Sequence, residues 1–182
     1  MENRLQILIA LIVAAFLMPG QVSSQTENSH ASAPNPLAKF DRLVGGRWHL
    51  EGSYQEFEWG VGHRSIIARS YFLVQGEPQL VSEGIWYWHP EEKRIKGVFT
   101  AINMPIEFFE YTTRFEGNSL VSELAAYDAE GNKSTYTEMW EFVDESHFVW
   151  TLFVETPEGP KKEMGGTYSR NSKRIEQMRS SD

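Results

Sequence analysis

The chain has no cysteine among its 182 residues, which excludes disulfide bonds, thiolate metal ligands and a cysteine nucleophile. It also lacks a Gly-x-Ser-x-Gly elbow, a phosphate-binding loop and a dinucleotide fingerprint. None of its five histidines forms a His-x-His or His-x-x-x-His pair, so no metal site is indicated. Stability must therefore come from a hydrophobic core, and function from residues that are distant in the sequence.

Basic residues are scarce as well. The chain has 17 Lys and Arg against 25 Asp and Glu, a formal net charge of −8. Nucleic acids and anionic lipid surfaces attract basic proteins. We therefore expect neither as a partner, and the sequence does not indicate an oligomeric state.

The only long apolar run, Leu5–Met18, is too short to span a bilayer comfortably. Pro19 and Gly20 break it, and Val22-Ser23-Ser24 offers the small residues that a signal peptidase reads. We predict a signal peptide over 1–24 and export to the periplasm or the cell exterior. A retained membrane anchor is the competing interpretation.

The rest of the chain divides into three parts by composition. Residues 25–35 are small and polar, as is typical of a flexible spacer, and residues 171–182 form a polar tail. Between them, 36–170 is expected to form one domain. Its first stretch, 36–44, resembles a short helix, with Asn35 as its cap and Pro36 at the first helical position.

After Gly45-Gly46 the pattern changes to alternating apolar and polar residues separated by turn residues. A run of sequential strands with no helix to cover an edge favours an up-and-down antiparallel β-barrel of about ten strands, with the short helix closing one end. The expected strands are 47–51, 54–59, 64–74, 80–88, 94–102, 105–116, 119–127, 133–142, 147–155 and 162–170.

Hairpin turns set the register of the last five strands. A two-residue turn on Gly117-Asn118 pairs Phe115 with Leu120. Loops ending in glycine predict that Asp128 pairs with Asn132 and that Thr156 pairs with Pro160. Between 142 and 148 the turn is ambiguous, and we choose the register that places Phe142 opposite Phe148.

These registers collect aromatic residues on one face, the expected lumen, and Glu138 lies among them near the middle of its strand. A carboxylate at that depth must be hydrogen-bonded, paired with a cation or protonated. It is either a ligand anchor or acid/base group, or a structural carboxylate bonded to neighbouring polar groups or water. Our candidate ligand-binding residues, all from this face, are Glu107, Phe109, Tyr111, Tyr136, Glu138, Trp140, Phe148, Trp150, Met164 and Tyr168.

Three functions follow from this arrangement. The first is binding of a small, largely apolar or amphipathic molecule in an aromatic lumen whose polar group is Glu138. The second is an enzyme with Glu138 as general acid/base, although no partner base or nucleophile can be identified from the sequence. The third is a filled barrel that acts as an interaction domain without a ligand.

The segment "PLAKFDRLVGGRWHLEG", 36–52, carries a family resemblance. A short helix followed by Gly46-Arg47-Trp48 resembles the start of calycin barrels, the group of lipocalins and fatty-acid-binding proteins. The arrangement is similar to nitrobindins in particular. With "EGIWYWHPEEKRI" and "TPEGPKKEMGGTYSR", the chain looks closest to an exported bacterial lipocalin-like family of unknown function.

That resemblance implies a fold and no established chemistry. Nitrobindins hold haem through a histidine on the last strand, whereas the matching positions here are Glu163 and Met164. We therefore expect no haem and no other cofactor.

Overall fold

The computed structural model describes residues 34–170. The expected signal peptide at 1–24, the spacer up to residue 33 and the tail at 171–182 lie outside the described residues. They stay predictions.

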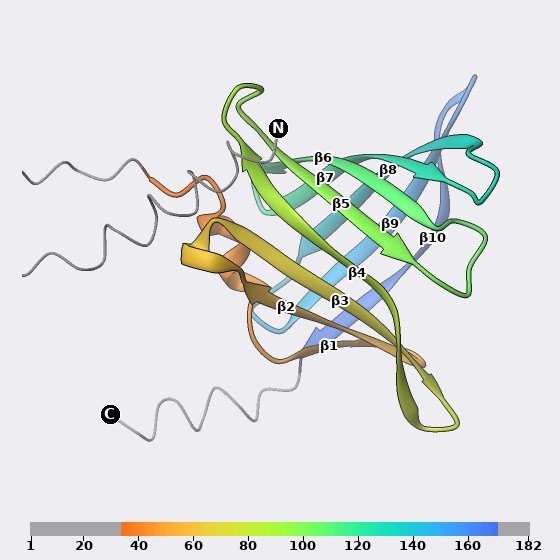
Figure 1. Ribbon diagram of the computed structural model, residues 1–182, viewed down its shortest axis with the longest axis horizontal. Coiled ribbons are helices and arrows are strands. Elements are labelled where there is room, and N and C mark those ends of the chain that lie inside the picture. The colour runs from red at the N-terminus through yellow and green to blue at the C-terminus, as the bar shows by residue number, and fades with distance from the viewer. Residues whose placement is uncertain (1–33, 171–182) are drawn as a thin grey trace, which may run out of the picture. The chain divides into compact units, whose positions relative to one another are not determined.

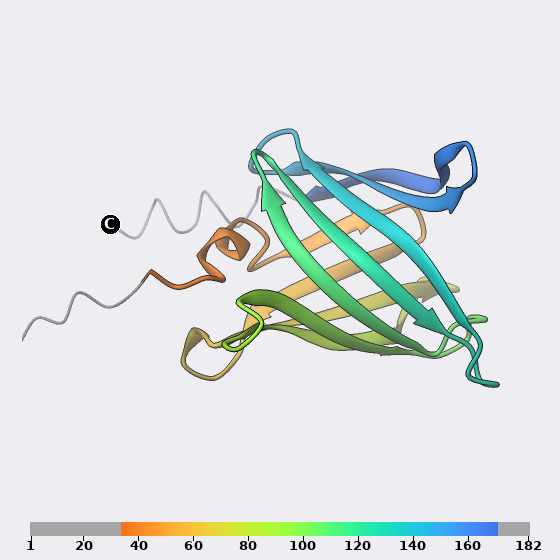
Figure 2. The same ribbon diagram turned by 90° about the horizontal axis from the view of Figure 1, so that it is seen from above.

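Ten antiparallel strands close into a single barrel, and each strand pairs with its neighbours in sequence (Figure 1 and Figure 2). The barrel closes where β1 meets β10, through the pairs Trp48 with Arg170 and His49 with Ser169. This confirms the all-β, ten-stranded, up-and-down architecture. The strands are β1 (Arg47–Leu50), β2 (Ser53–Trp59), β3 (Ser65–Val74), β4 (Glu77–His89), β5 (Arg94–Ala101), β6 (Phe108–Glu116), β7 (Ser119–Tyr127), β8 (Lys133–Phe142), β9 (His147–Thr156) and β10 (Gly159–Arg170).

The register expected from the hairpin turns is confirmed in strands β6 to β9. Phe115 pairs with Leu120, and Phe142 pairs with Phe148. Glu138 consequently lies between Ser122 on β7 and Leu152 on β9. Its side chain and the alternate ones that follow it on β8 are buried, as the period of two requires.

The hairpin between β9 and β10 differs from the prediction by one residue. Thr156 pairs with Gly159, and Pro160 with Glu155, so that the loop is shorter than expected. A register shift between Lys162 and Met164 then inserts Glu163 as a bulge and restores the expected pairing beyond it. The turn prediction was wrong, but the facing of the rest of β10 was correct.

The helix that forms within 36–44 is shorter than expected. Only a five-residue 3-10 helix, η1 (Ala38–Arg42), forms there. The Asn35 side chain accepts a hydrogen bond from the backbone N–H of Leu37 at 3.0 Å, so it caps this turn. Gly45 and Gly46 take positive φ angles of 83° and 74°, which end the segment and lead the chain into β1.

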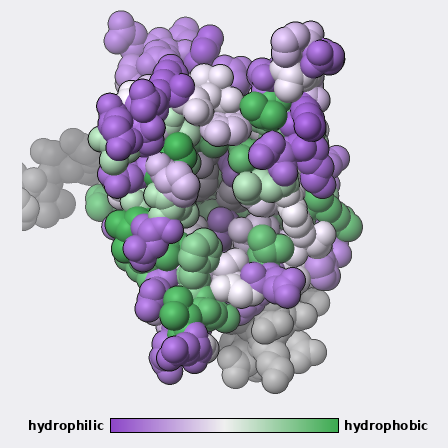
Figure 3. Space-filling view, turned by 90° about the vertical axis from the view of Figure 1, so that its right-hand side faces the viewer, coloured by the Kyte–Doolittle hydropathy of each residue, from purple (hydrophilic) through white to green (hydrophobic). Residues whose placement is uncertain are grey.

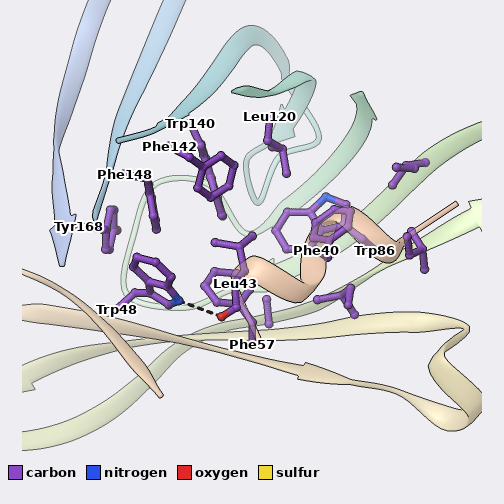
Figure 4. Packing of buried hydrophobic residues seen from close by; sticks show 14 of the residues in the cluster. Phe40, Leu43, Trp48, Phe57, Trp86, Leu120, Trp140, Phe142, Phe148 and Tyr168 are labelled. Carbon is purple, nitrogen blue, oxygen red and sulfur yellow. Dashed lines mark hydrogen bonds between the residues drawn. The ribbon is translucent and has the colours of Figure 1, made fainter. Parts of the chain in front are cut away.

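Large side chains fill the end of the barrel that lies beside η1 (Figure 4). The ring of Phe40 lies 5.5 Å from that of Trp86 and 5.1 Å from that of Phe115, measured between centroids. Trp140 and Phe148 stack at 5.0 Å in the same cluster. This end of the barrel is therefore packed.

Trp48 ties η1 to the barrel. Its indole N–H donates to the carbonyl of Leu43 at 2.8 Å (Figure 4). The guanidinium of Arg170 lies 4.5 Å from the Trp48 ring centre and donates to the carbonyls of Val44 and Gly45. Arg170 is therefore part-buried against Trp48, with which it pairs between β1 and β10.

Candidate functional site

A cavity of about 580 Å³ lies in the barrel lumen at the end opposite η1. Its lining comes from β2, β3, β4, β6 to β10 and the loop at 104–106. Figure 3 looks onto this end and shows a hollow at the centre of the face, with hydrophobic side chains around it. The volume is within the range of small-molecule sites.

Most of the candidate ligand-binding residues lie on the wall of this cavity. Aromatic side chains predominate among them, and Glu138 is the polar exception. The wall residues that the sequence identified are Phe109, Tyr111, Tyr136, Glu138, Trp150, Met164 and Tyr168.

Three of the candidates lie elsewhere. Trp140 and Phe148 face the lumen but belong to the packed cluster beside η1 and do not line the cavity. Glu107 precedes β6, is exposed, and is not part of the wall. Its backbone closes the loop by bonding to Ala101 and Tyr127, so its position is fixed by main-chain contacts.

Glu138 is 7% exposed and has two unequal oxygens. Oε1 accepts a hydrogen bond of 2.6 Å from the indole N–H of Trp150 on β9. Oε2 is shielded from solvent and has no hydrogen-bond partner among residues 34–170. One half of the carboxyl is therefore held in place, and the other half is shielded and unsatisfied, in a residue that lines the cavity.

Burial raises the pKa of Glu138 from 4.5 to about 7, because the charged form loses its hydration. The hydrogen bond from Trp150 opposes this shift, and so does the nearby indole N–H of Trp140. The Trp140 N–H makes no hydrogen bond of acceptable geometry within the described part of the chain, so Trp150 is the donor that positions the carboxyl. Glu138 therefore titrates near neutral pH.

Two tyrosines of the wall share this environment. Burial raises the pKa of Tyr111 well above its ordinary value, and the neighbouring Glu138 raises it further. Burial and Glu138 shift the pKa of Tyr168 in the same direction. Both phenols are therefore neutral over the range in which Glu138 titrates, and they offer hydroxyl groups and ring faces to a ligand.

The wall also contains polar residues that were not among the candidates, including Gln55 and Glu163. Gln55 on β2 lines the cavity, and its Oε1 is buried without a hydrogen-bond partner in the range 34–170. Glu163 reaches the cavity through the bulge on β10. Gln55 does alternate with Phe57, but we assigned no register to the first strands, so the sequence did not give its face.

The wall offers few groups for acid/base chemistry. Besides Glu138, its titratable side chains in the described chain are Glu163 and the tyrosines, and neither histidine nor lysine nor arginine is among them. No hydrogen bond within 34–170 joins Glu138 to a second titratable group. The geometry accordingly suits binding through the carboxyl better than a coupled proton transfer.

No protein-family model matches this chain, and no curated protein matches its sequence. The resemblance to calycins and nitrobindins consequently stays a prediction.

Across residues 34–170, no three His, Asp or Glu side chains are grouped as a metal site would require. Nor does that range contain a helix of the length and apolarity needed to cross a membrane.

Proposed function

We propose that this protein binds a small, largely apolar molecule in the barrel lumen, with Glu138 as the polar anchor. The observation that carries the proposal is the second oxygen of Glu138, which is buried and unpartnered on an otherwise mostly apolar wall. An unsatisfied buried acceptor costs roughly 1–3 kcal/mol. A ligand that donates a hydrogen bond to it recovers that cost, and the aromatic wall supplies the contact area.

We propose also that the protein is exported and belongs to the lipocalin-like group. The apolar run at Leu5–Met18 and the breakers that follow it support export. The short 3-10 turn before Gly46-Arg47-Trp48 and the closed barrel agree with a calycin-like fold. We expect no haem, because β10 has no histidine.

A second candidate function is general acid/base catalysis by Glu138. The observation in its favour is the pKa of about 7, which is near the value that a group needs to give and take a proton at neutral pH. The same carboxyl would then act on a bound substrate rather than hold a ligand. A variant that keeps the shape of the side chain but cannot titrate separates the two functions.

Native mass spectrometry of the purified protein tests the proposed function. We expect the wild type to carry a bound small molecule, or to acquire one on addition of apolar probes, and Glu138→Leu to lose it. The reason is that leucine fills the space but accepts no hydrogen bond. Glu141→Leu is the matched control, since Glu141 lies on the same strand but is exposed on the outer face, and it should keep the ligand.

Three results would point away from a binding role for Glu138. Equal retention of ligand by Glu138→Leu and Glu141→Leu would show that the carboxyl is structural. A wild type that neither carries nor takes up a small molecule would favour a filled interaction domain. Loss of turnover in Glu138→Gln with binding intact would identify the acid/base function.

A further inference from the structure

We propose that the polar end of the ligand is a protonated amine, seated against Glu138 among the aromatic rings of the cavity wall. This inference rests on the proposed function and specifies its ligand class. It excludes carboxylates and phosphates and ranks neutral alcohols below amines.

The unsatisfied polar atoms of the wall are acceptors. Within 34–170, the buried side-chain atoms without partners include Glu138 Oε2 and Gln55 Oε1, and both residues line the cavity. The unpartnered donors are on Trp86, Trp140 and Arg170, which do not line the cavity, although the Trp140 N–H lies near Glu138. A ligand that satisfies these unpartnered oxygens must supply hydrogen-bond donors. An ammonium group supplies three and accepts none.

The charge of the cavity has one sign. Glu138 lies in its wall, Glu163 reaches it through the β10 bulge, and no basic side chain of the described chain lines it. Lys161 and Lys162 precede the bulge and are exposed without contributing to the wall. An anionic head would therefore be desolvated beside a carboxylate with no cation to compensate it. A cationic head forms an ion pair instead, and the net charge of −8 favours its approach.

The rings around Glu138 suit a cation. Trp150 donates its indole N–H to Oε1, so its ring is fixed beside the carboxyl. Tyr111 and Tyr168 are close enough for Glu138 to raise the pKa of each. Ring faces attract ammonium groups, most strongly where water is excluded. The terminal torsion of a glutamate is soft, so the unpartnered oxygen can turn toward a donor in the cavity.

An ammonium ligand also gives a definite pH dependence. In the empty cavity Glu138 is protonated below its pKa of about 7 and must lose that proton to pair with a cation. Amine affinity should consequently rise with pH through this range. The titratable groups on the wall that faces Glu138 are Tyr111 on β6, Tyr136 on its own strand, Tyr54 on β2, and Tyr168 and Glu163 on β10. From β7 and β9 its neighbours are the non-titrating Ser122, Leu152 and Trp150.

Binding of decylamine, 1-decanol and decanoate, followed by tryptophan fluorescence or calorimetry, tests this inference. The three probes share one chain and differ in the head group. We expect decylamine to bind at least about tenfold more tightly than decanol, and decanoate to bind weakest. The decylamine affinity should increase between about pH 6 and about pH 8, the range in which Glu138 ionises.

Glu138→Gln should reduce decylamine binding to the level of decanol and remove its pH dependence, with decanol affected little. Glu141→Gln is the control and should keep the amine preference. Equal binding of amine and alcohol by the wild type, or tighter binding of decanoate, would overturn the ligand class while leaving a binding lumen established. If the wild type bound none of the three probes and carried no small molecule, the proposed function would fail together with the ligand class.

Discussion

Glu138→Gln should remove a loss of stability that the wild type shows between about pH 4.5 and about pH 7. Burial raises the pKa of Glu138 from 4.5 to about 7 on folding. Between these values the native state holds a proton that the unfolded chain has released, so the free energy of unfolding falls as pH rises. The stabilisation is complete below 4.5 and is lost as pH passes through about 7. Its total is roughly 3 kcal/mol.

Denaturant unfolding of the wild type and of Glu138→Gln across this pH range measures the effect. Glutamine does not titrate, so the difference between the two free energies of unfolding should change by roughly 3 kcal/mol in favour of glutamine as pH rises. Groups with a lowered pKa, such as Asp144 and Asp128, act at more acid pH and equally in both proteins. Parallel curves for wild type and variant would mean that the carboxyl is hydrated in the native state.

Trp48→Ala should destabilise the barrel by about 3–5 kcal/mol. Trp48 is fully buried, and its ring packs 4.9 Å from that of Phe148, measured between centroids. Alanine would open a cavity in the packed end, leave the Leu43 carbonyl without its donor and remove the ring beneath Arg170. The shift of the unfolding midpoint in denaturant gives the size of the loss.

Trp59→Ala is the matched control for this variant. The Trp59 indole also donates a hydrogen bond, to Asp41 at 2.8 Å, but its side chain is only partly buried. We expect it to cost about 1–2 kcal/mol. Equal losses for the two variants would contradict the view that the complete burial of Trp48 in the packed core, and not its indole hydrogen bond alone, stabilises the barrel.

The facing of the last five strands could be predicted because short hairpin loops fix their register. Gly117-Asn118 and the glycine of the 128–132 loop permit few turn geometries. Each geometry determines which side chains of the next strand face the lumen. Glu138 was placed correctly between Ser122 and Leu152 for this reason. In β10 the shorter loop and the Glu163 bulge cancel each other, so that Met164 and Tyr168 face as expected. Nothing in the local sequence indicated that cancellation.

Alternation along a strand gives the face of a side chain but not its height in the barrel. Trp140 and Trp150 both point inward and are paired across β8 and β9, yet only Trp150 lines the cavity. The difference arises because apolar side chains of the η1 segment fill one end of the lumen, where Trp140 also packs. Such a contact joins residues far apart in the sequence, and the alternation pattern does not contain it.

Gln55 was missed for a related reason. No register was assigned to the first strands, and β2 and β3 are joined by a longer connection that contains the 3-10 turn η2 (Val61–His63). Without a register, we could not tell which side chains of β2 face the lumen together with those of the C-terminal strands. The sequence therefore identified Glu138 as a buried acceptor but not Gln55, whose Oε1 is a second unpartnered acceptor in a residue of the wall.

NMR titration of isotope-labelled glutamate carboxyl carbons tests most directly whether Glu138 is a buried anchor for a donor. Its signal can be assigned by its loss in Glu138→Gln. We expect a midpoint of about 7 in the free protein and a clear decrease when decylamine is added, because the ammonium group favours the ionised carboxylate. A midpoint close to 4.5 that decylamine leaves unchanged would show a solvated carboxyl without a ligand-binding role.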